Sequence, residues 1–309
     1  MATTSQVQGL PQTQARRAAS GSPTRTSPVI YAVLIVIAIA SLSPFIWMVM
    51  TSVKDYGDVV SLKVWPWPPL GDSHPNLGNF AEAINTIGVD QETGLPLFVR
   101  QILNTALVTA IVIVITVTTS VMAAYAFAQL DFPGKGVLFV LVLATFMIPE
   151  ELMLVPRAVM MNKAYLNWYN TLPAMVAPFL ATAFGIFLLR QFFLQIPRDL
   201  FDAARIDGAN HLSYLTRIMV PLARPAILTL TLLEFIGMWN EYRWIQLVTA
   251  TESMRTVSVG LVGFLQGEGG AQTQLAMAVA VMVVLPVVVL YLFTQRYFTE
   301  GITTTGLKG

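Results

Sequence analysis

Long runs of apolar residues, separated by short charged segments, dominate this sequence. Four windows of at least 26 residues contain no Asp, Glu, Lys or Arg, and they lie between residues 25 and 54, 100 and 131, 163 and 190, and 268 and 296. A helix that crosses the hydrocarbon core of a bilayer needs about 20 mainly apolar residues. Each window is long enough, so the pattern predicts an all-α protein that crosses a membrane several times.

The full pattern predicts six transmembrane helices within residues 28–299. We expect them at residues 28–53, 102–130, a third beginning after Lys135, 171–189, 225–248 and 272–298. The third is interrupted by Pro149, Glu150 and Glu151, with Pro156 shortly after. A span with this sequence has to bend, and its carboxylates have to be kept out of lipid.

The segments outside these spans are polar. Residues 1–27 are rich in Ser, Thr, Gln, Ala and Arg and have no apolar face, which indicates a disordered tail. The apolar stretch that follows is too long for the core of a signal peptide, and no convincing cleavage site follows it. Residues 54–99 form a long loop with a Trp- and Pro-rich run at 64–69, which suits a membrane interface, and residues 300–309 form a short tail.

Positive charges favour one orientation of the six spans. Segments on the side of the termini carry 11 Lys and Arg residues, against 7 on the opposite side, and residues 190–224 alone carry five. Cytoplasmic loops are enriched in these residues. We therefore expect both termini and the loop 196–224, between the fourth and fifth helices, to be cytoplasmic, and the loop 54–99 to be extracytoplasmic.

Composition narrows the function classes. Only 11% of the residues are charged, whereas a soluble domain carries about 25%. The net charge of +1 and the lack of a basic stripe argue against a nucleic-acid partner. The chain has no Cys, which excludes disulfides, thiolate nucleophiles and Cys metal sites. Its two His residues, His74 and His211, lie too far apart to suggest a metal site, and we interpret His211 as a solvated residue.

The loop 196–224 has the pattern of a helix-turn-helix outside the bilayer. Asp199 is expected to cap a helix that opens after Pro197, and Gly208 permits a turn to a second helix. Ala203 and Ala204 leave a surface that another chain could approach closely. The residues alone leave two interpretations open, which are a docking element for a soluble partner and an amphipathic connector resting on lipid headgroups.

This loop resembles the EAA motif of ABC importer permeases. It contains Asp202-Ala203-Ala204, Gly208 and the run 218–221 at matching spacing, with Asp in place of Glu and Val220 in place of Leu. The resemblance extends from the first helix to the C-terminus through the runs 132–134, 147–149, 184–193, 239–241 and 295–309. Together these segments are similar to the inner-membrane permeases of prokaryotic carbohydrate ABC importers, of the maltose-transporter second-permease type.

The resemblance implies a division of labour between subunits. A second permease, an ATPase dimer, an extracytoplasmic solute-binding protein and a carbohydrate substrate are the implied partners. The implied ATPase-coupling residues are Asp202, Ala203, Ala204, Asp207, Gly208 and Ala209, and the implied ATPase-interface tail is Thr305, Gly306, Leu307, Lys308 and Gly309. The chain has no Gly-rich phosphate loop, because the segment 134–136 lacks the upstream Gly and the following hydroxyl. We therefore expect no enzyme activity and no cofactor on this chain, with ATP and Mg on the partner ATPase.

Ionisable and aromatic residues near the spans are candidates for the substrate pathway. Glu234 follows Pro225 by nine residues, about 14 Å along a helix, and a carboxylate at that depth is costly and by default functional. It either faces a translocation cavity or is paired inside the bundle, unless the span is misplaced. Trp239 and Asn240 could contact a sugar or belong to an aromatic belt at the interface.

Glu150 and Glu151 are expected in a water-filled mouth. Neighbouring residues on a helix point about 100° apart, so the two carboxylates do not converge on one bond as in a glycosidase. An ion-coupled secondary transporter with Glu234 in a proton relay is the alternative function. Such a transporter has no reason to present the pattern of residues 202–221, which favours the importer permease.

Overall fold

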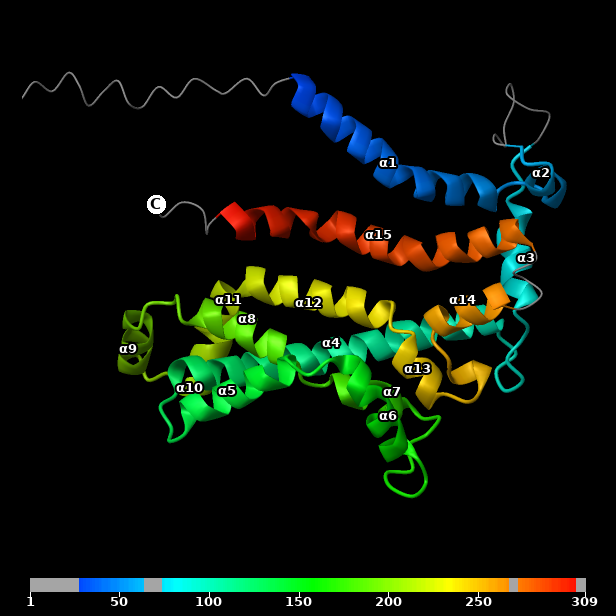
Figure 1. Cartoon of the computed structure of the whole chain (residues 1–309). Coiled ribbons are helices and arrows are strands. Elements are labelled where there is room, and N and C mark those ends of the chain that lie inside the picture. Colours follow the sequence, from blue (N-terminus) through cyan, green and yellow to red (C-terminus); the bar gives the residue numbers. More distant parts are fainter. Residues whose placement is uncertain (1–27, 64–73, 267–271, 304–309) are drawn as a thin grey trace, which may run out of the picture. The chain divides into compact units, whose positions relative to one another are not determined.

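The computed structural model describes residues 28–63, 74–266 and 272–303 (Figure 1). Within these ranges the protein is helical and contains no strand, only an isolated antiparallel bridge between Val89 and Pro96. The predicted all-α class is therefore confirmed. The longer helices are α1 (Pro28–Ser52), α3 (Gly78–Thr86), α4 (Leu97–Gln129), α5 (Lys135–Phe146), α6 (Glu150–Met161), α8 (Ala183–Phe193), α9 (Asp199–Ile206), α12 (Arg224–Trp239), α14 (Val257–Gln266) and α15 (Thr273–Thr303).

Shorter helical turns connect these helices. They are α2 (Tyr56–Val60), α7 (Leu172–Val176), η1 (Ala177–Phe179), α10 (His211–Tyr214), the π-helical turn η2 (Leu215–Met219), α11 (Val220–Leu222), α13 (Arg243–Val248) and η3 (Glu252–Met254). The chain divides into two compact units, one ending at Trp47 and one beginning at Met48. The first contains most of α1, an apolar helix that continues through Pro44, and the second contains the remaining elements.

Three helices are long and apolar enough to cross a membrane, namely α1, α4 and residues 273–295 of α15. Three further pairs pass the same test only together, because each is bent at a short break. The bends are 94° between α5 and α6, 44° between α7–η1 and α8, and 79° between α10–α11 and α12. By length and composition the described residues thus hold three spans, or up to six if each bent pair is one span. The predicted interruption of the third span is confirmed.

The structure differs from the predicted spans and loops in four places. The fourth span is not a straight helix, since it bends before Ala183. The fifth ends at Trp239 instead of Val248, and a short break precedes α13. The loop 54–99 contains the helices α2 and α3. A further helix, α14, was missed because it has only 10 residues, fewer than a span needs.

Hydroxyl groups of α4 stabilise the bend in the fourth predicted span. Where the helix stops between η1 and α8, backbone carbonyls lose their partners, which is costly away from water. The Thr116 hydroxyl donates a hydrogen bond to the Phe179 carbonyl, and the Thr119 hydroxyl donates to the Leu180 carbonyl at 2.9 Å. These bonds give two of the Thr residues of the apolar helix α4 a structural role at the bend.

The core of the second unit is arranged along α4, which contacts α8, α12, α14 and α3 (Figure 1). One cluster of buried side chains joins α4 to α8, η2 and α12, and a second joins α4 to α7, α13 and α14. A third joins α3 and α14 to α15. The helices beside α4 therefore hold fixed positions, and these positions define the sites described below.

Gly185 allows α8 to approach α4 and α12 closely. A Cβ atom at this position would lie 2.6 Å from Ser120 Oγ and 3.0 Å from Leu230 Cδ2. We expect Gly185→Ala to lower the free energy of unfolding by about 1–3 kcal/mol through overpacking. Gly237→Ala is the matched control, because its Cβ meets nothing within 4 Å and Ala is the better helix former. Thermal unfolding of the purified variants checks this, and equal melting temperatures would contradict the packing argument.

Candidate functional site

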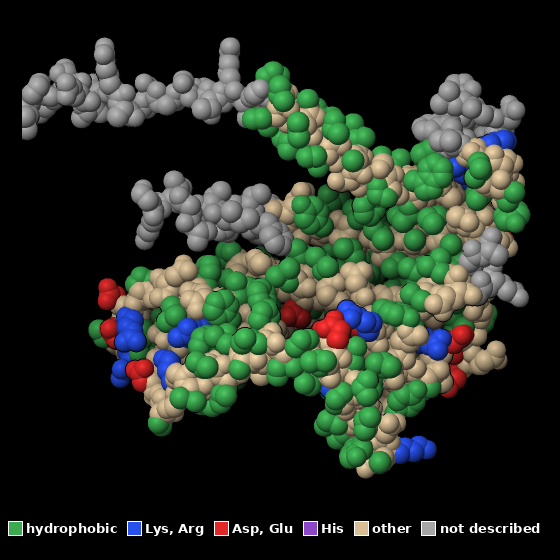
Figure 2. Space-filling model, viewed as in Figure 1, with side chains coloured by type: hydrophobic (Ala, Val, Ile, Leu, Met, Phe, Trp, Pro, Cys, Tyr) green, Lys and Arg blue, Asp and Glu red, His purple; other side chains and the backbone are tan. Residues whose placement is uncertain are grey.

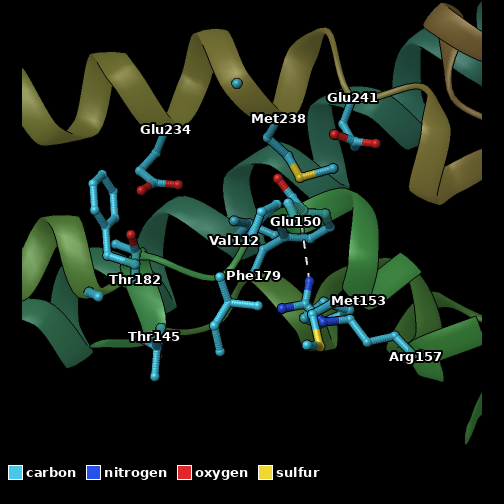
Figure 3. A pocket seen from close by; sticks show the side chains of 17 residues that line it. Val112, Thr145, Glu150, Met153, Arg157, Phe179, Thr182, Glu234, Met238 and Glu241 are labelled. Carbon is cyan, nitrogen blue, oxygen red and sulfur yellow. Dashed lines mark ion pairs between the residues drawn. The ribbon is translucent and has the colours of Figure 1, made fainter. Parts of the chain in front are cut away.

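A cavity of about 680 Å³ lies within the second unit, where α4, α5, α6, α8 and α12 meet (Figure 3). Its wall is mixed, with apolar side chains between a small number of polar ones. The polar lining side chains are those of Thr145, Glu150, Arg157, Thr182, Glu234 and Glu241.

The bends described above create this cavity. Helix α5 ends at Phe146 and α6 begins at Glu150, after Pro149, which cannot continue a helix at that geometry. Both Glu150 and Thr182, the residue before α8, lie at helix N-termini and line the cavity. The partial positive charge of a helix N-terminus favours a carboxylate there. The breaks therefore bring polar groups and helix ends to a part of the chain that is otherwise apolar.

Glu234 projects from α12 into the cavity (Figure 3). Its side chain is half-buried, and within the described part of the chain it has neither a hydrogen bond nor an ion pair. A carboxyl group paired inside the bundle would have such a partner. The sequence left open whether Glu234 faces a cavity or is paired inside the bundle, and this placement favours a position on the cavity wall.

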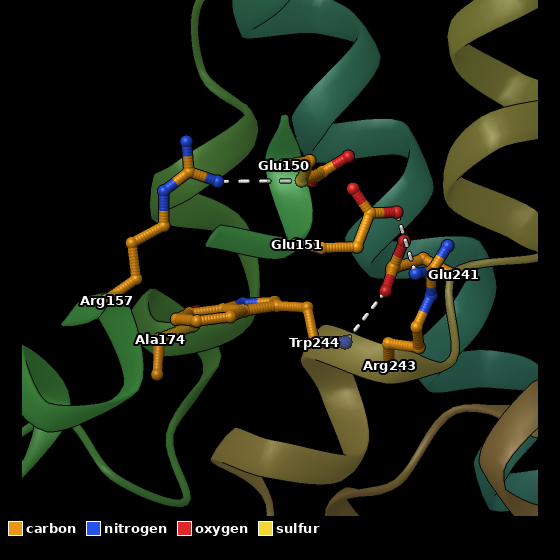
Figure 4. A network of polar contacts seen from close by, with 7 residues as sticks. All are labelled: Glu150, Glu151, Arg157, Ala174, Glu241, Arg243 and Trp244. Carbon is orange, nitrogen blue, oxygen red and sulfur yellow. Dashed lines mark hydrogen bonds and ion pairs between the residues drawn. The ribbon is translucent and has the colours of Figure 1, made fainter. Parts of the chain in front are cut away.

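The neighbouring carboxylates Glu150 and Glu151 face different partners (Figure 4). Glu150 Oε1 lies 3.9 Å from an Nη1 atom of Arg157 and lines the cavity. Glu151 Oε1 lies 2.9 Å from Nη1 of Arg243 and is not part of the cavity wall, although both carboxylates are exposed to a similar degree. The ion pair between Glu151 and Arg243 connects α6 to α13. Of the two neighbouring carboxylates, only that of Glu150 therefore reaches the cavity.

Among the charged residues of the wall, sequence reasoning missed two, Glu241 and Arg157. The Glu241 carboxylate accepts a hydrogen bond from the backbone N–H of Trp244 at 2.8 Å, which stabilises the start of α13 (Figure 4). A signal for Glu241 was present, because it follows Glu234 by seven residues, a spacing that places two residues on one face of a continuous helix. In the structure Glu241 reaches the wall from the break after α12, which ends at Trp239. No comparable signal identified Arg157.

Trp239 and Asn240 lie outside the cavity wall. The indole of Trp239 is buried, and its Nε1 donates a hydrogen bond to the Val283 carbonyl of α15 at 3.1 Å. Asn240 is exposed, and its Nδ2 donates to the carbonyl of Ile236 in its own helix. Trp239 thus joins α12 to α15, so the geometry gives it a packing role instead of a place in an interfacial aromatic belt.

The loop after α8 forms two short helices joined by a turn, as the sequence predicts. Gly208 has φ = +79°, a conformation that side chains rarely adopt, and it lies between α9 and α10. Asn210 caps α10 by accepting a hydrogen bond from Ser213 N at 2.8 Å. The predicted cap at Asp199 is wrong, because α9 begins at Asp199 and Arg198 is the preceding residue, with no side-chain cap.

The surface of α9 differs from the expected one. Ala203 is exposed, as are Asp202, Asp207 and Gly208, whereas Ala204 is buried against the first core cluster. Only one of the two Ala residues is therefore open to another chain. Ile206 is 87% exposed and adds an apolar side chain to this surface. Figure 2 shows charged side chains gathered on this helix beside apolar ones.

Aromatic side chains attach this loop to α4. The Tyr125 hydroxyl lies 2.7 Å from His211 Nδ1, and the Phe201 ring packs edge-on against Tyr214 at 5.0 Å between centroids. His211 is exposed but hydrogen-bonded, in agreement with its prediction as a solvated residue. A chain of side-chain contacts therefore runs from α9 through α10 to α4.

The predicted tail Thr305, Gly306, Leu307, Lys308 and Gly309 lies outside the described residues.

In the part of the chain that the structure describes, no group of three His, Asp or Glu residues could hold a metal ion.

The sequence matches the model of one protein family across residues 18–304. This family is described as the binding-protein-dependent transport system inner membrane component. Among curated proteins, the arabinooligosaccharides transport system permease protein AraQ of Halalkalibacterium halodurans is 34% identical over 206 residues, 67% of this chain and 73% of its own length. The trehalose/maltose transport system permease protein MalG of Thermococcus litoralis is 31% identical over 277 residues, 89% of this chain and 94% of its own length.

A solved structure shares the fold. A chain of a bacterial ABC transporter involved in the import of the acidic polysaccharide alginate superposes with a TM-score of 0.74 at 23% sequence identity, covering 94% of this chain and all of that chain. A chain of a bacterial alginate ABC transporter in complex with an alginate pentasaccharide-bound periplasmic protein gives a TM-score of 0.60 at 16% identity, over 88% and 95% of the two chains.

Proposed function

The chain belongs to the family of binding-protein-dependent transport system inner membrane components, and from this premise we propose that it forms half of the translocation pathway of an ATP-driven carbohydrate importer. It is an importer permease, and its helices are those of a multi-pass membrane protein. The relatives named above are permeases of sugar transport systems, which supports a sugar or polyol as the substrate.

In this proposal, the three bent helix pairs each form one span, which gives six spans in the inner membrane of a prokaryotic cell. Both termini and the α9–α10 loop lie in the cytoplasm, as the distribution of Lys and Arg indicates. The charged bend between α5 and α6 supports this arrangement, because it contains irregular backbone and carboxylates that lipid would not accommodate and that a water-filled pathway would.

The α9–α10 loop is proposed as the contact with a separate ATPase subunit, which supplies ATP and Mg. The exposed Ile206 and Ala203, beside exposed carboxylates, support a docking surface for a soluble partner. The exposed Gly208 completes this surface. The tail at residues 305–309 is proposed to reach between the two ATPase subunits. A second permease and an extracytoplasmic solute-binding protein complete the complex.

The observation that carries the pathway proposal is the cavity with Glu234 at its wall. A half-buried carboxyl group without a protein partner is costly in an apolar region unless it serves a solute or water. The cavity is also of a size typical for small-molecule sites, about 300–1,000 Å³.

Reconstitution tests this function. Proteoliposomes that contain the chain with its partner permease, ATPase and binding protein are expected to take up the sugar only when ATP is supplied to the ATPase side. The purified chain alone is expected to show no ATP hydrolysis, since it lacks a phosphate loop. Uptake driven by a proton gradient without ATP would instead support the secondary transporter.

A further inference from the structure

The charged side chains on the cavity wall are mostly of one sign. Glu150, Glu234 and Glu241 contribute three carboxyl groups, whereas Arg157 is the single cation among the described residues that line it. These carboxyl groups come from two sides, with Glu150 on α6 and Glu234 on α12 (Figure 3). A solute inside the cavity would therefore meet carboxyl groups on both sides, of which that of Glu150 is paired with Arg157.

The guanidinium of Arg157 is already paired. Its Nη1 lies 3.9 Å from Glu150 Oε1, and both residues belong to α6. Arg243 lies nearby but binds Glu151 at 2.9 Å and is not part of the wall. Within the described cavity wall, an anionic solute would thus find no cation that is not already matched by a carboxylate.

This arrangement has a direct electrostatic consequence. Ionised carboxylates act only as hydrogen-bond acceptors, so they match the hydroxyl donors of a sugar. A carboxylate, sulfonate or phosphate on the solute would instead face like charges in a cavity walled partly by apolar groups, where charges are screened less than in water. A cationic group would be attracted.

We propose that the cavity selects solutes by charge, admitting uncharged or cationic hydroxyl-bearing solutes and disfavouring anionic ones. The proposal rests on the proposed function and narrows its substrate class to sugars without acidic groups. The acidic cargo named for the structural neighbour is accordingly not expected for this chain.

The chain has no Cys, so a single introduced thiol can report the charge preference of the cavity. Thr182→Cys places a thiol on the wall of the same cavity that Glu234 lines (Figure 3). The assembled complex is treated with a cationic trimethylammonium-ethyl methanethiosulfonate or an anionic sulfonatoethyl methanethiosulfonate. Each rate is divided by the rate of the same reagent with free mercaptoethanol. We expect the cationic reagent to be favoured about tenfold, a typical effect of a cleft lined by one sign of charge.

Charge-neutral variants identify the source of this preference. Glu234→Gln and Glu241→Gln in the Thr182→Cys background should each lower the preference for the cationic reagent. Glu82→Gln, on the exposed surface of α3 and away from the cavity, is the matched control and should leave it unchanged. Any shift in the pKa of the thiol alters both rates equally and cancels in the ratio.

A thiol at a second position of the wall shows whether the charge preference belongs to the whole cavity or only to the surroundings of residue 182. Thr145→Cys lies on α5 in the same wall and should show the same preference. A ratio at or below one at both thiols, no reaction at either, or a ratio unchanged by Glu234→Gln would overturn the proposal. ATP-driven uptake by the same complexes is measured in parallel, because normal uptake with no charge preference would refute the selectivity while leaving the importer function intact.

Discussion

Gly208→Val is expected to reduce ATP-driven uptake at least tenfold without preventing membrane insertion. Gly208 adopts φ = +79° between α9 and α10, and a side chain in the left-handed region costs about 1–2 kcal/mol, more for a β-branched residue. The turn would relax to another conformation and shift α9. Because α9 is the proposed ATPase contact, less ATPase subunit should co-purify with the variant.

Two matched variants distinguish the effect of the backbone conformation at Gly208 from the effect of adding a larger side chain. Gly208→Asn should retain most of the activity, since Asn tolerates the left-handed region better than other residues. Gly57→Val adds the same side chain at a Gly without positive φ and without a neighbour within 4 Å, so it should have little effect. Co-purified ATPase and uptake are measured for all three variants. If Gly208→Val keeps full uptake and normal co-purification of the ATPase, the α9–α10 loop does not couple this chain to the ATPase.

The sequence predicted the location of the apolar helices well because charge-free windows depend only on local composition. It also predicted the bend of the third span, since Pro149 and two Glu residues cannot continue a lipid-facing helix. The turn at Gly208 was predictable for a similar reason. Each of these features is determined by residues close together in the chain.

Features that depend on contacts between distant segments were not predictable. Backbone carbonyls at the bend before Ala183 accept hydrogen bonds from hydroxyl groups of Thr116 and Thr119, more than 60 residues earlier. The burial of Trp239 depends on a carbonyl of α15, 44 residues away. Seen in the sequence alone, Trp239 and Asn240 look equally available to a solute.

The candidate cavity was predicted only in its separate parts. Glu150 and Glu234 were identified as costly charges in apolar segments, but their placement on one cavity required the packing of α6 and α12. Glu151 was expected to share the environment of Glu150, yet the helix directs it to Arg243 instead. Helical geometry separates neighbours by about 100°, so adjacent residues seldom share a site.

Glu234 allows the decisive test of the pathway. If its carboxyl group contacts the solute or its water, Glu234→Gln should change the apparent affinity or the turnover of uptake, because size and hydrogen bonding are kept while the charge is lost. Glu234→Leu removes the polar group altogether and should lower uptake at least tenfold. Neither variant should dissociate the complex, because Glu234 has no protein partner in the described part of the chain.

Thermal stability distinguishes this role from a structural one. Glu234→Leu should leave the melting temperature unchanged or raised, because burial of an unpaired carboxyl group is costly. A group paired inside the bundle behaves differently, since its loss leaves a partner unsatisfied at a cost of about 1–3 kcal/mol. Asn104→Leu provides that comparison, because the Asn104 Nδ2 donates to the carbonyls of Ser253 and Arg255 at 2.7 and 3.0 Å. If Glu234→Leu loses stability as Asn104→Leu does, or keeps full uptake, Glu234 does not belong to the translocation pathway.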